Sequence, residues 1–189
     1  MTAANFQAAI TFIWASNRDG SRNDSAPGET FLTVKGITQQ TWDYAVAQCI
    51  VAGSLGDATD DQLRAVYRAL FWAPMHCSSL PSGVDLLMFA NGCLMGTGHE
   101  ARQLQHVVGT TQDGMIGPLT IAATMKLGAK ATIDGLIAAD LAYLMTTRMW
   151  SVFQHGWTTR LNDTKVAAYQ LAGISVAAIA RRGRKKHKR

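Results

Sequence analysis

Three carboxyl side chains fall within one short polar segment near the start of this chain. They are Asp19, Asp24 and Glu29, and the segment reads RDGSRNDSAPGET over residues 18–30. Two carboxyl groups that flank a bond can act as a general acid and as a base, provided that each reaches the reacting atoms. Asp-Gly pairs and single Asp residues are equally ordinary in turns. The segment therefore predicts either a catalytic pair or a plain polar loop.

The residues that could bind a metal or form disulfides are scattered. The histidines form no metal-ligand spacing; they are His76, His99, His106, His155 and His187. The cysteines are odd in number and form no Cys-x-x-Cys pair, which predicts buried thiols at Cys49, Cys77 and Cys93. We therefore expect neither a metal nor another cofactor.

Hydrophobic spacing predicts that helices position the polar segment. A helix is expected over residues 3–16, followed by a loop and a short β element near residues 28–36. Thr38 is a predicted N-cap, and Thr59 with Gln62 has the spacing of a capping box. Each cap marks the start of a further helix.

The second half of the chain is predicted to be helical throughout. Helices are expected at residues 84–95, 98–108, 118–126 and 132–154, with Gly156 ending the last one. No run of about 18 apolar residues occurs, so no membrane-spanning helix is expected. The chain of 189 residues is predicted to be mainly α, with one small β element.

The stretch LQHVVGTTQDGMIGPLT, at residues 104–120, carries the most specific local pattern. Gly109, Gly114 and Gly117 stand where a compact loop needs a positive φ or a close backbone approach. Pro118 suits the first turn of a helix, where its missing N–H costs nothing. The pattern predicts a helix, a tight loop and a second helix.

This stretch resembles the "LQ…G…DG.iGp.T" element of glycoside hydrolase family 108, the phage and bacterial N-acetylmuramidases. Four other segments resemble motifs of that family and occur in the same order: PGETFLTVKGITQQTWD at 27–43, AVYRALFW at 65–72, LPSGVDLLMF at 80–89 and RMWSVFQHGWTTRL at 148–161. The resemblance implies a lysozyme-like α+β fold. It also implies a catalytic lobe at residues 1–80 and a helical peptidoglycan-binding lobe at 81–165. The composition of residues 166–189 predicts an apolar helix with a basic tail.

The family's catalytic Glu is replaced in this chain. With one gap, Asp19 falls on that Glu and would be the proton donor; without the gap, Arg18 falls there and the protein would be inactive. Glu29 is a third candidate for the acid. Asp24 would be the second carboxylate, and Thr33 matches a family Thr expected to position water.

The resemblance also implies residues that bind the glycan and departures that alter the cleft. Aromatic side chains in the cleft-forming segments are candidates for stacking on sugars, although aromatics at helical spacing are more often core residues; they are Trp42, Tyr67, Trp72 and Trp157. Ala90 and Leu94 stand where the family commonly has Asp and Asn, which predicts a less polar cleft.

The net charge of +5 comes from the C-terminal end of the chain. Seven of the 18 Lys and Arg residues lie in RRGRKKHKR, which leaves 11 basic against 13 acidic residues, or −2, for the rest. The seven are Arg181, Arg182, Arg184, Lys185, Lys186, Lys188 and Arg189. Together with the apolar stretch at 166–180, they are expected to contact an anionic membrane or nucleic acid, unless the end is merely solvated.

The sequence as a whole favours a phage-type peptidoglycan hydrolase that acts on glycan strands without a metal. No secretory signal is recognisable at the N-terminus, so we expect synthesis in the host cytoplasm and release by a holin, or carriage in a virion. The alternative is a catalytically inactive, lysozyme-like structural protein that binds wall glycan or neighbouring virion subunits.

Overall fold

The computed structural model describes residues 3–16 and 32–176 of the chain. Asp19, Asp24, Glu29 and the basic residues of 181–189 lie outside the described residues. Within them the helices are α1 (Ala3–Ser16), α2 (Gln39–Ala47), α3 (Asp60–Tyr67), α4 (Val84–Met95), α5 (Thr97–Val108), α6 (Pro118–Leu127), α7 (Ala129–Thr146) and α8 (Trp150–Leu171). Short helical turns cover Leu55–Asp57, Arg68–Trp72 and Cys77–Ser79.

The described β structure is one small hairpin. Strands β1 (Thr33–Val34) and β2 (Ile37–Thr38) pair antiparallel, with Thr33 opposite Thr38. The predicted mainly α architecture with a β element near residues 28–36 is therefore confirmed.

The predicted caps are also confirmed. The Thr38 hydroxyl accepts a hydrogen bond from the Thr41 N–H at the start of α2. Thr59 and Gln62 form a reciprocal capping box at the start of α3. These polar side chains satisfy backbone N–H groups that have no partner within the helix, which is why the two starts were readable from sequence.

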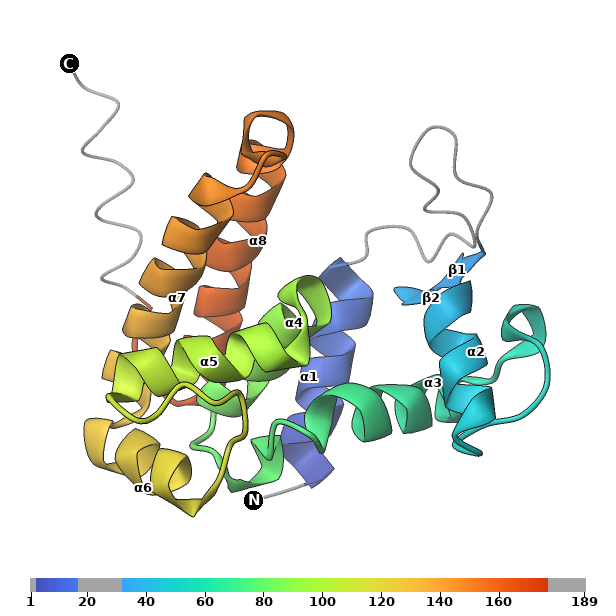
Figure 1. The fold of residues 1–189 in the computed structure, drawn as a ribbon, viewed down its shortest axis with the longest axis horizontal. Coiled ribbons are helices and arrows are strands. Elements are labelled where there is room, and N and C mark those ends of the chain that lie inside the picture. The colour runs from blue at the N-terminus through green and yellow to red at the C-terminus, as the bar shows by residue number, and fades with distance from the viewer. Residues whose placement is uncertain (1–2, 17–31, 177–189) are drawn as a thin grey trace.

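Helix α4 runs through the centre of the molecule and packs against α1, α5, α7 and α8 (Figure 1). Its residues from Val84 to Gly92 are all buried. Asp85 ties α4 to α1, because its Oδ2 accepts a 2.6 Å hydrogen bond from Asn5 Nδ2. At Gly83, where φ is +88°, a Cβ atom would lie 2.2 Å from the carbonyl oxygen of Ala168 in α8. The fold therefore requires glycine where α8 crosses the start of α4.

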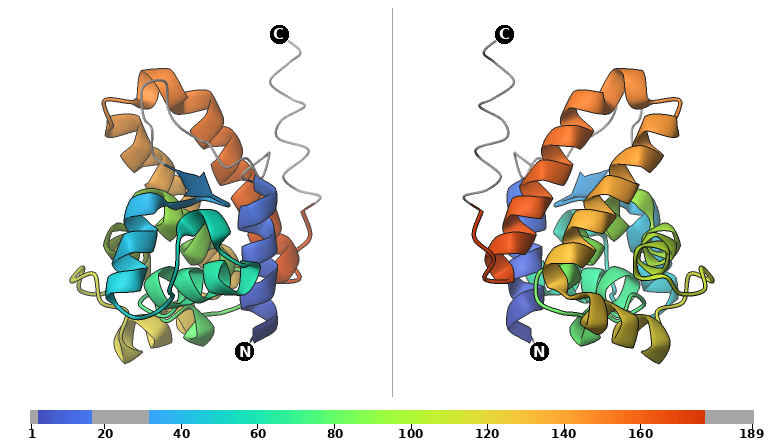
Figure 2. Two further views of the ribbon diagram at one scale, coloured as in Figure 1. Left: turned by 90° about the vertical axis from the view of Figure 1, so that its right-hand side faces the viewer. Right: turned by 90° about the vertical axis from the view of Figure 1, so that its left-hand side faces the viewer.

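Helices α7 and α8 form an antiparallel hairpin, which Figure 2 shows side by side in both views. Asp134 of α7 accepts hydrogen bonds from Lys130 at 2.8 Å, from Lys165 of α8 at 2.5 Å and from the Tyr169 hydroxyl at 2.6 Å. These cationic and hydroxyl partners hold the pKa of Asp134 below its usual range, although partial burial opposes them. The Asp134 cluster thus joins the two helices near their inner ends.

The predicted helix over 132–154 is wrong at its C-terminal end. The chain leaves the helical conformation at Thr147, with φ −76° and ψ 147°, and α8 starts at Trp150. Gly156 does not end a helix but lies inside α8. A single glycine costs a helix only about 1 kcal/mol, which the packing of the inner half of α8 outweighs.

The apolar stretch at 166–180 is likewise not a separate helix over its described part. Residues 166–171 are the last turns of α8, and Ala168 and Tyr169 are buried there. Buried side chains from Phe6 in α1 to Tyr169 in α8 belong to one continuous core. The prediction of buried thiols is confirmed for Cys77 and wrong for Cys49, which is exposed in the turn that follows α2, whereas Cys93 is half-buried.

Candidate functional site

A pocket of about 670 Å³ lies where α1 ends, between α1, the end of α4 and the outer half of α8. Its lining residues are Phe12, Ala15, Leu94, His155, Gly156, Trp157, Thr159, Arg160 and Asp163. The described part of α1 stops at Ser16, next to this pocket, and the polar segment with Asp19 follows in sequence. We call it the α1–α8 pocket.

Arg160 supplies the cation of the α1–α8 pocket. Its Nε atom is buried and has no hydrogen-bond partner among the described residues. Burial lowers the pKa of the Arg160 guanidinium, and electrostatic interaction with the Cys93 and Tyr67 side chains partly opposes this effect. Because a buried polar N–H without a partner is unfavourable, this Nε–H is a candidate donor to an anionic or strongly polar group that enters the pocket.

A second set of contacts fixes the β hairpin against the end of α1. The Lys35 Nζ atom lies 4.1 Å from the centre of the Trp14 ring, and the Arg64 guanidinium lies 4.8 Å from it. The Tyr67 hydroxyl donates a 2.8 Å hydrogen bond to the Lys35 carbonyl oxygen. Burial raises the pKa of Tyr67, so this hydroxyl keeps its proton and the contact persists at neutral pH.

Thr33 begins β1 and is 9% exposed. It is the one candidate catalytic residue that lies within the described residues. Its strand pairs with β2 through Thr38, so the hairpin holds its backbone. The role of Thr33 in positioning water remains a prediction.

Three of the four aromatic candidates prove to be core residues, with side chains 1–2% exposed: Trp42, Tyr67 and Trp72. Trp42 Nε1 donates to the Gly53 carbonyl at 2.9 Å, and Trp72 Nε1 donates to Ser78 Oγ at 2.8 Å. The helical spacing that drew attention to them reflects packing, and they present no open ring face to a sugar. Trp157 differs, because it is half-exposed and lines the α1–α8 pocket.

Leu94 also lines the α1–α8 pocket, and Ala90 is fully buried. Ala90 therefore lines no described cleft, and the less polar cleft stays a prediction that only the position of Leu94 bears on. Helix α4 still carries buried polar groups one residue away, because Asn91 is 0% exposed. Its Nδ2 donates a 2.7 Å hydrogen bond to Asp140.

Sequence reasoning missed a buried carboxyl pair formed by Glu100 of α5 and Asp140 of α7, both 0% exposed. The two carboxyl groups are electrostatically coupled, and burial raises both pKa values, that of Asp140 to about 7. Glu100 keeps its proton more readily than Asp140, because Asn91 donates to Asp140 and lowers the pKa of that carboxyl group. The sequence signal was an acidic residue beside the buried Ala101 and Leu104 on α5.

One buried side chain, that of Gln105, holds the loop within residues 104–120 through three hydrogen bonds. Gln105 is 1% exposed, and its Nε2 donates to Asp113 Oδ1 at 2.6 Å and to the Met115 carbonyl at 3.0 Å. Its Oε1 accepts from the Gly114 N–H at 2.8 Å. Gly114 takes the predicted positive φ, at +81°. The stretch is thus a clamped loop, in which Gln105 replaces the missing backbone partners.

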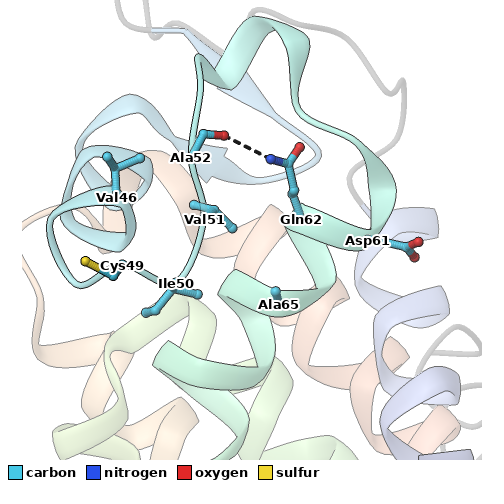
Figure 3. Close-up of a pocket in the computed structure, with 8 residues that line it drawn as sticks. All are labelled: Val46, Cys49, Ile50, Val51, Ala52, Asp61, Gln62 and Ala65. Carbon is cyan, nitrogen blue, oxygen red and sulfur yellow. Dashed lines mark hydrogen bonds between the residues drawn. The ribbon is translucent and has the colours of Figure 1, made fainter.

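A second pocket, of about 680 Å³, lies between the end of α2 and the start of α3 (Figure 3). Most of its lining is apolar, and Gln62 donates to the Ala52 carbonyl at 2.9 Å across one side. Its carboxyl group, Asp61, is paired with Arg64 at 3.0 Å. With one carboxylate that already has a partner, this pocket lacks the pair that acid–base chemistry needs.

Residues 3–16 and 32–176 contain neither a metal-binding cluster nor a membrane-spanning helix. No group of three His, Cys, Asp or Glu side chains is arranged there to hold a metal ion. No helix in this part of the chain is long and apolar enough to cross a membrane.

Comparison with known proteins agrees with the sequence patterns. Residues 19–96 match the family model described as Glycosyl hydrolase 108. No curated protein matches the chain in sequence. The solved structure of SagA from Brucella abortus is similar, with a TM-score of 0.79 and 27% sequence identity over 90% of this chain and 97% of SagA. The family match over residues 19–96 and the fold shared with SagA support a lysozyme-like protein that is similar to the glycosyl hydrolase 108 family.

Proposed function

We propose that the protein is a peptidoglycan hydrolase of the N-acetylmuramidase type. It would cut the β-1,4 bond between N-acetylmuramic acid and N-acetylglucosamine. The observation that carries the proposal is the position of the α1–α8 pocket. The pocket lies at the end of α1, and one of its lining residues, Leu94, belongs to the segment that matches the family model. The acidic segment follows α1 directly in sequence.

Asp19 is the proposed proton donor, with Asp24 and Thr33 stabilising charge or positioning water. Only two residues separate Asp19 from Ser16, the last residue of α1. Glycosidases commonly use one carboxylic acid to protonate the leaving oxygen and a second carboxylate as base or nucleophile. Glu29 is the alternative acid, from the same segment.

The test is digestion of purified peptidoglycan sacculi in the presence of a chelator, with products identified by mass. Muramic acid at the new reducing ends is the expected product. Replacing Asp19 with Asn should lower the rate about 100- to 10,000-fold, the usual effect of losing a general acid, while the melting temperature stays unchanged. Full activity in Asp19→Asn together with loss in Glu29→Gln would assign the acid to Glu29 instead.

A second candidate function is an inactive, lysozyme-like structural protein of a virion. It is favoured by the absence of a Glu at the position where the family carries its acid. It would bind wall glycan or neighbouring subunits through the same fold. Sacculi that remain uncut over days at every pH between 4 and 8 would support this function and refute the hydrolase.

The biological setting is proposed on the sequence alone. The hydrolase would be made in the host cytoplasm and would act in phage lysis after release by a holin, or in wall penetration as part of a virion. The basic residues of 181–189 would add contact with an anionic membrane or nucleic acid.

A further inference from the structure

One face of α8 changes its environment halfway along the helix. Trp150, Trp157, Leu161, Thr164 and Ala168 follow at steps of seven, four, three and four residues, so they share that face. The inner three are 0–2% exposed and pack into the core. The outer part of the hairpin projects past α4 and α5 (Figure 1). The outer half of the same face therefore lacks the helices that cover its inner half.

Aromatic rings occupy this outer half. The Trp150 and Trp157 ring centres lie 6.4 Å apart with planes at 37°, and the Phe153 and Trp157 centres lie 5.6 Å apart at 34°. Phe153 is 46% exposed, and both tryptophans are half-exposed. We call these three residues the aromatic strip; at 1.5 Å per residue it extends over about 10 Å.

The aromatic strip is continuous with the α1–α8 pocket. Trp157 belongs to both, and the pocket continues past it to the polar side chains Thr159, Arg160 and Asp163. Flat rings beside hydroxyl, guanidinium and carboxyl groups suit a ligand with apolar ring faces and polar edges. A sugar polymer has that chemistry along its whole length.

The charges near the strip favour a glycan over a membrane. Helices that lie in a membrane interface carry Lys and Arg along their polar face. The ten residues 150–159 contain neither Lys nor Arg. An exposed apolar patch that leads into a pocket with polar side chains is instead typical of a ligand groove.

We propose that Trp150, Phe153 and Trp157 extend the α1–α8 pocket and stack on sugar rings of the glycan strand beyond the bond that is cut. The inference rests on the proposed function for the identity of the polymer. It assigns to α8 a role in holding long strands, distinct from the chemistry of the acidic segment.

The test measures binding and cutting separately with the full chain. Co-sedimentation with sacculi at 200 mM salt compares the wild type with a Trp150→Ala/Phe153→Ala double variant, because salt suppresses contacts made by the basic residues. Losing two stacking rings should weaken binding about 10-fold or more. The conservative variant Trp150→Phe/Phe153→Tyr should keep binding, and so should Leu119→Ala, which alters an 82% exposed side chain on α6.

Several outcomes would refute the proposal that the aromatic strip binds glycan. One is unchanged sacculus binding by the double variant, and another is failure of the wild type to sediment with sacculi. Loss of vesicle binding or of self-association without loss of sacculus binding would assign the surface to a membrane or to a second copy. If the double variant melts early, Phe153→Ala alone carries the test, because that ring is the most exposed of the three.

Failure of the proposed function would look different. Sacculi that are bound but never cut would refute the proposed hydrolase activity and would leave the proposed glycan binding by the aromatic strip unaffected. In an active enzyme, the double variant should lose kcat/KM on sacculi and retain it on short oligosaccharides, because short ligands do not reach the strip. Equal losses on both substrates would contradict the inference.

Discussion

Replacing Asp140 with Asn should flatten the pH dependence of stability. Burial raises the pKa of Asp140 to about 7, whereas an Asp in an unfolded chain titrates near 3.9. Between those values the folded protein holds a proton that the unfolded chain has released, so the free energy of unfolding falls as pH rises. A difference of about 3 pKa units corresponds to about 4 kcal/mol lost between pH 4 and pH 7. Glu100, whose pKa is also raised by burial, adds to the loss in the same direction.

Asn is the matched replacement because it has the shape of Asp and no proton to release. Its Oδ1 can still accept the hydrogen bond from Asn91, and its amide can donate to Glu100. Urea unfolding at several pH values between 4.5 and 8 measures the effect as a difference between variant and wild type. The difference is needed because partial burial lowers the pKa of His99, which makes stability rise with pH over part of this range.

The variant should gain about 2 to 4 kcal/mol relative to the wild type between pH 4.5 and 7.5, the lower figure allowing for relaxation around the pair. Parallel curves for the two proteins would refute a raised pKa of Asp140 in the core. So would a variant that loses stability mainly at high pH.

Three other changes have expected outcomes. Replacing Gln105 with Ala removes three hydrogen bonds that hold the loop after α5 and should cost about 2 to 4 kcal/mol in urea unfolding; an unchanged midpoint would contradict the clamp. Replacing Gly83 with Ala places a Cβ atom 2.2 Å from the Ala168 carbonyl oxygen at a φ of +88°, so the melting temperature should fall by about 10 °C or more. Deleting residues 181–189 should leave the melting temperature and any hydrolysis unchanged and should abolish binding to anionic vesicles or nucleic acid, a binding that weakens between about 50 and 200 mM salt in the full chain; equal binding by both forms would refute it.

Local patterns predicted the elements well wherever the stabilising interaction is itself local. The Thr38 cap and the box of Thr59 and Gln62 each link residues three apart, so the sequence contains both partners. The positive φ of Gly114 was readable for the same reason. The break between α7 and α8 was not, because the hairpin depends on contacts such as the one between Asp134 and Lys165, 31 residues apart in the chain.

For the candidate site, sequence order pointed to the family and to the acidic segment after α1. It did not separate Trp157, which lines the pocket, from Trp42 and Trp72, which are buried, because apolar spacing is the same for a core stripe and an exposed strip. Nor did it single out Arg160, which the fold brings into electrostatic interaction with Cys93 of α4 and Tyr67 of α3.

The sequence by itself determined the class of fold, the helix starts, the order of the family motifs and the concentration of positive charge at the C-terminus. Each of these depends on residue type and on spacing within one segment. Only the tertiary structure decided which aromatic rings are exposed, which carboxyl groups are buried together and which guanidinium nitrogen lacks a partner among the described residues. Those properties depend on which helices meet, and a surface is exposed or buried only in relation to the elements that cover it.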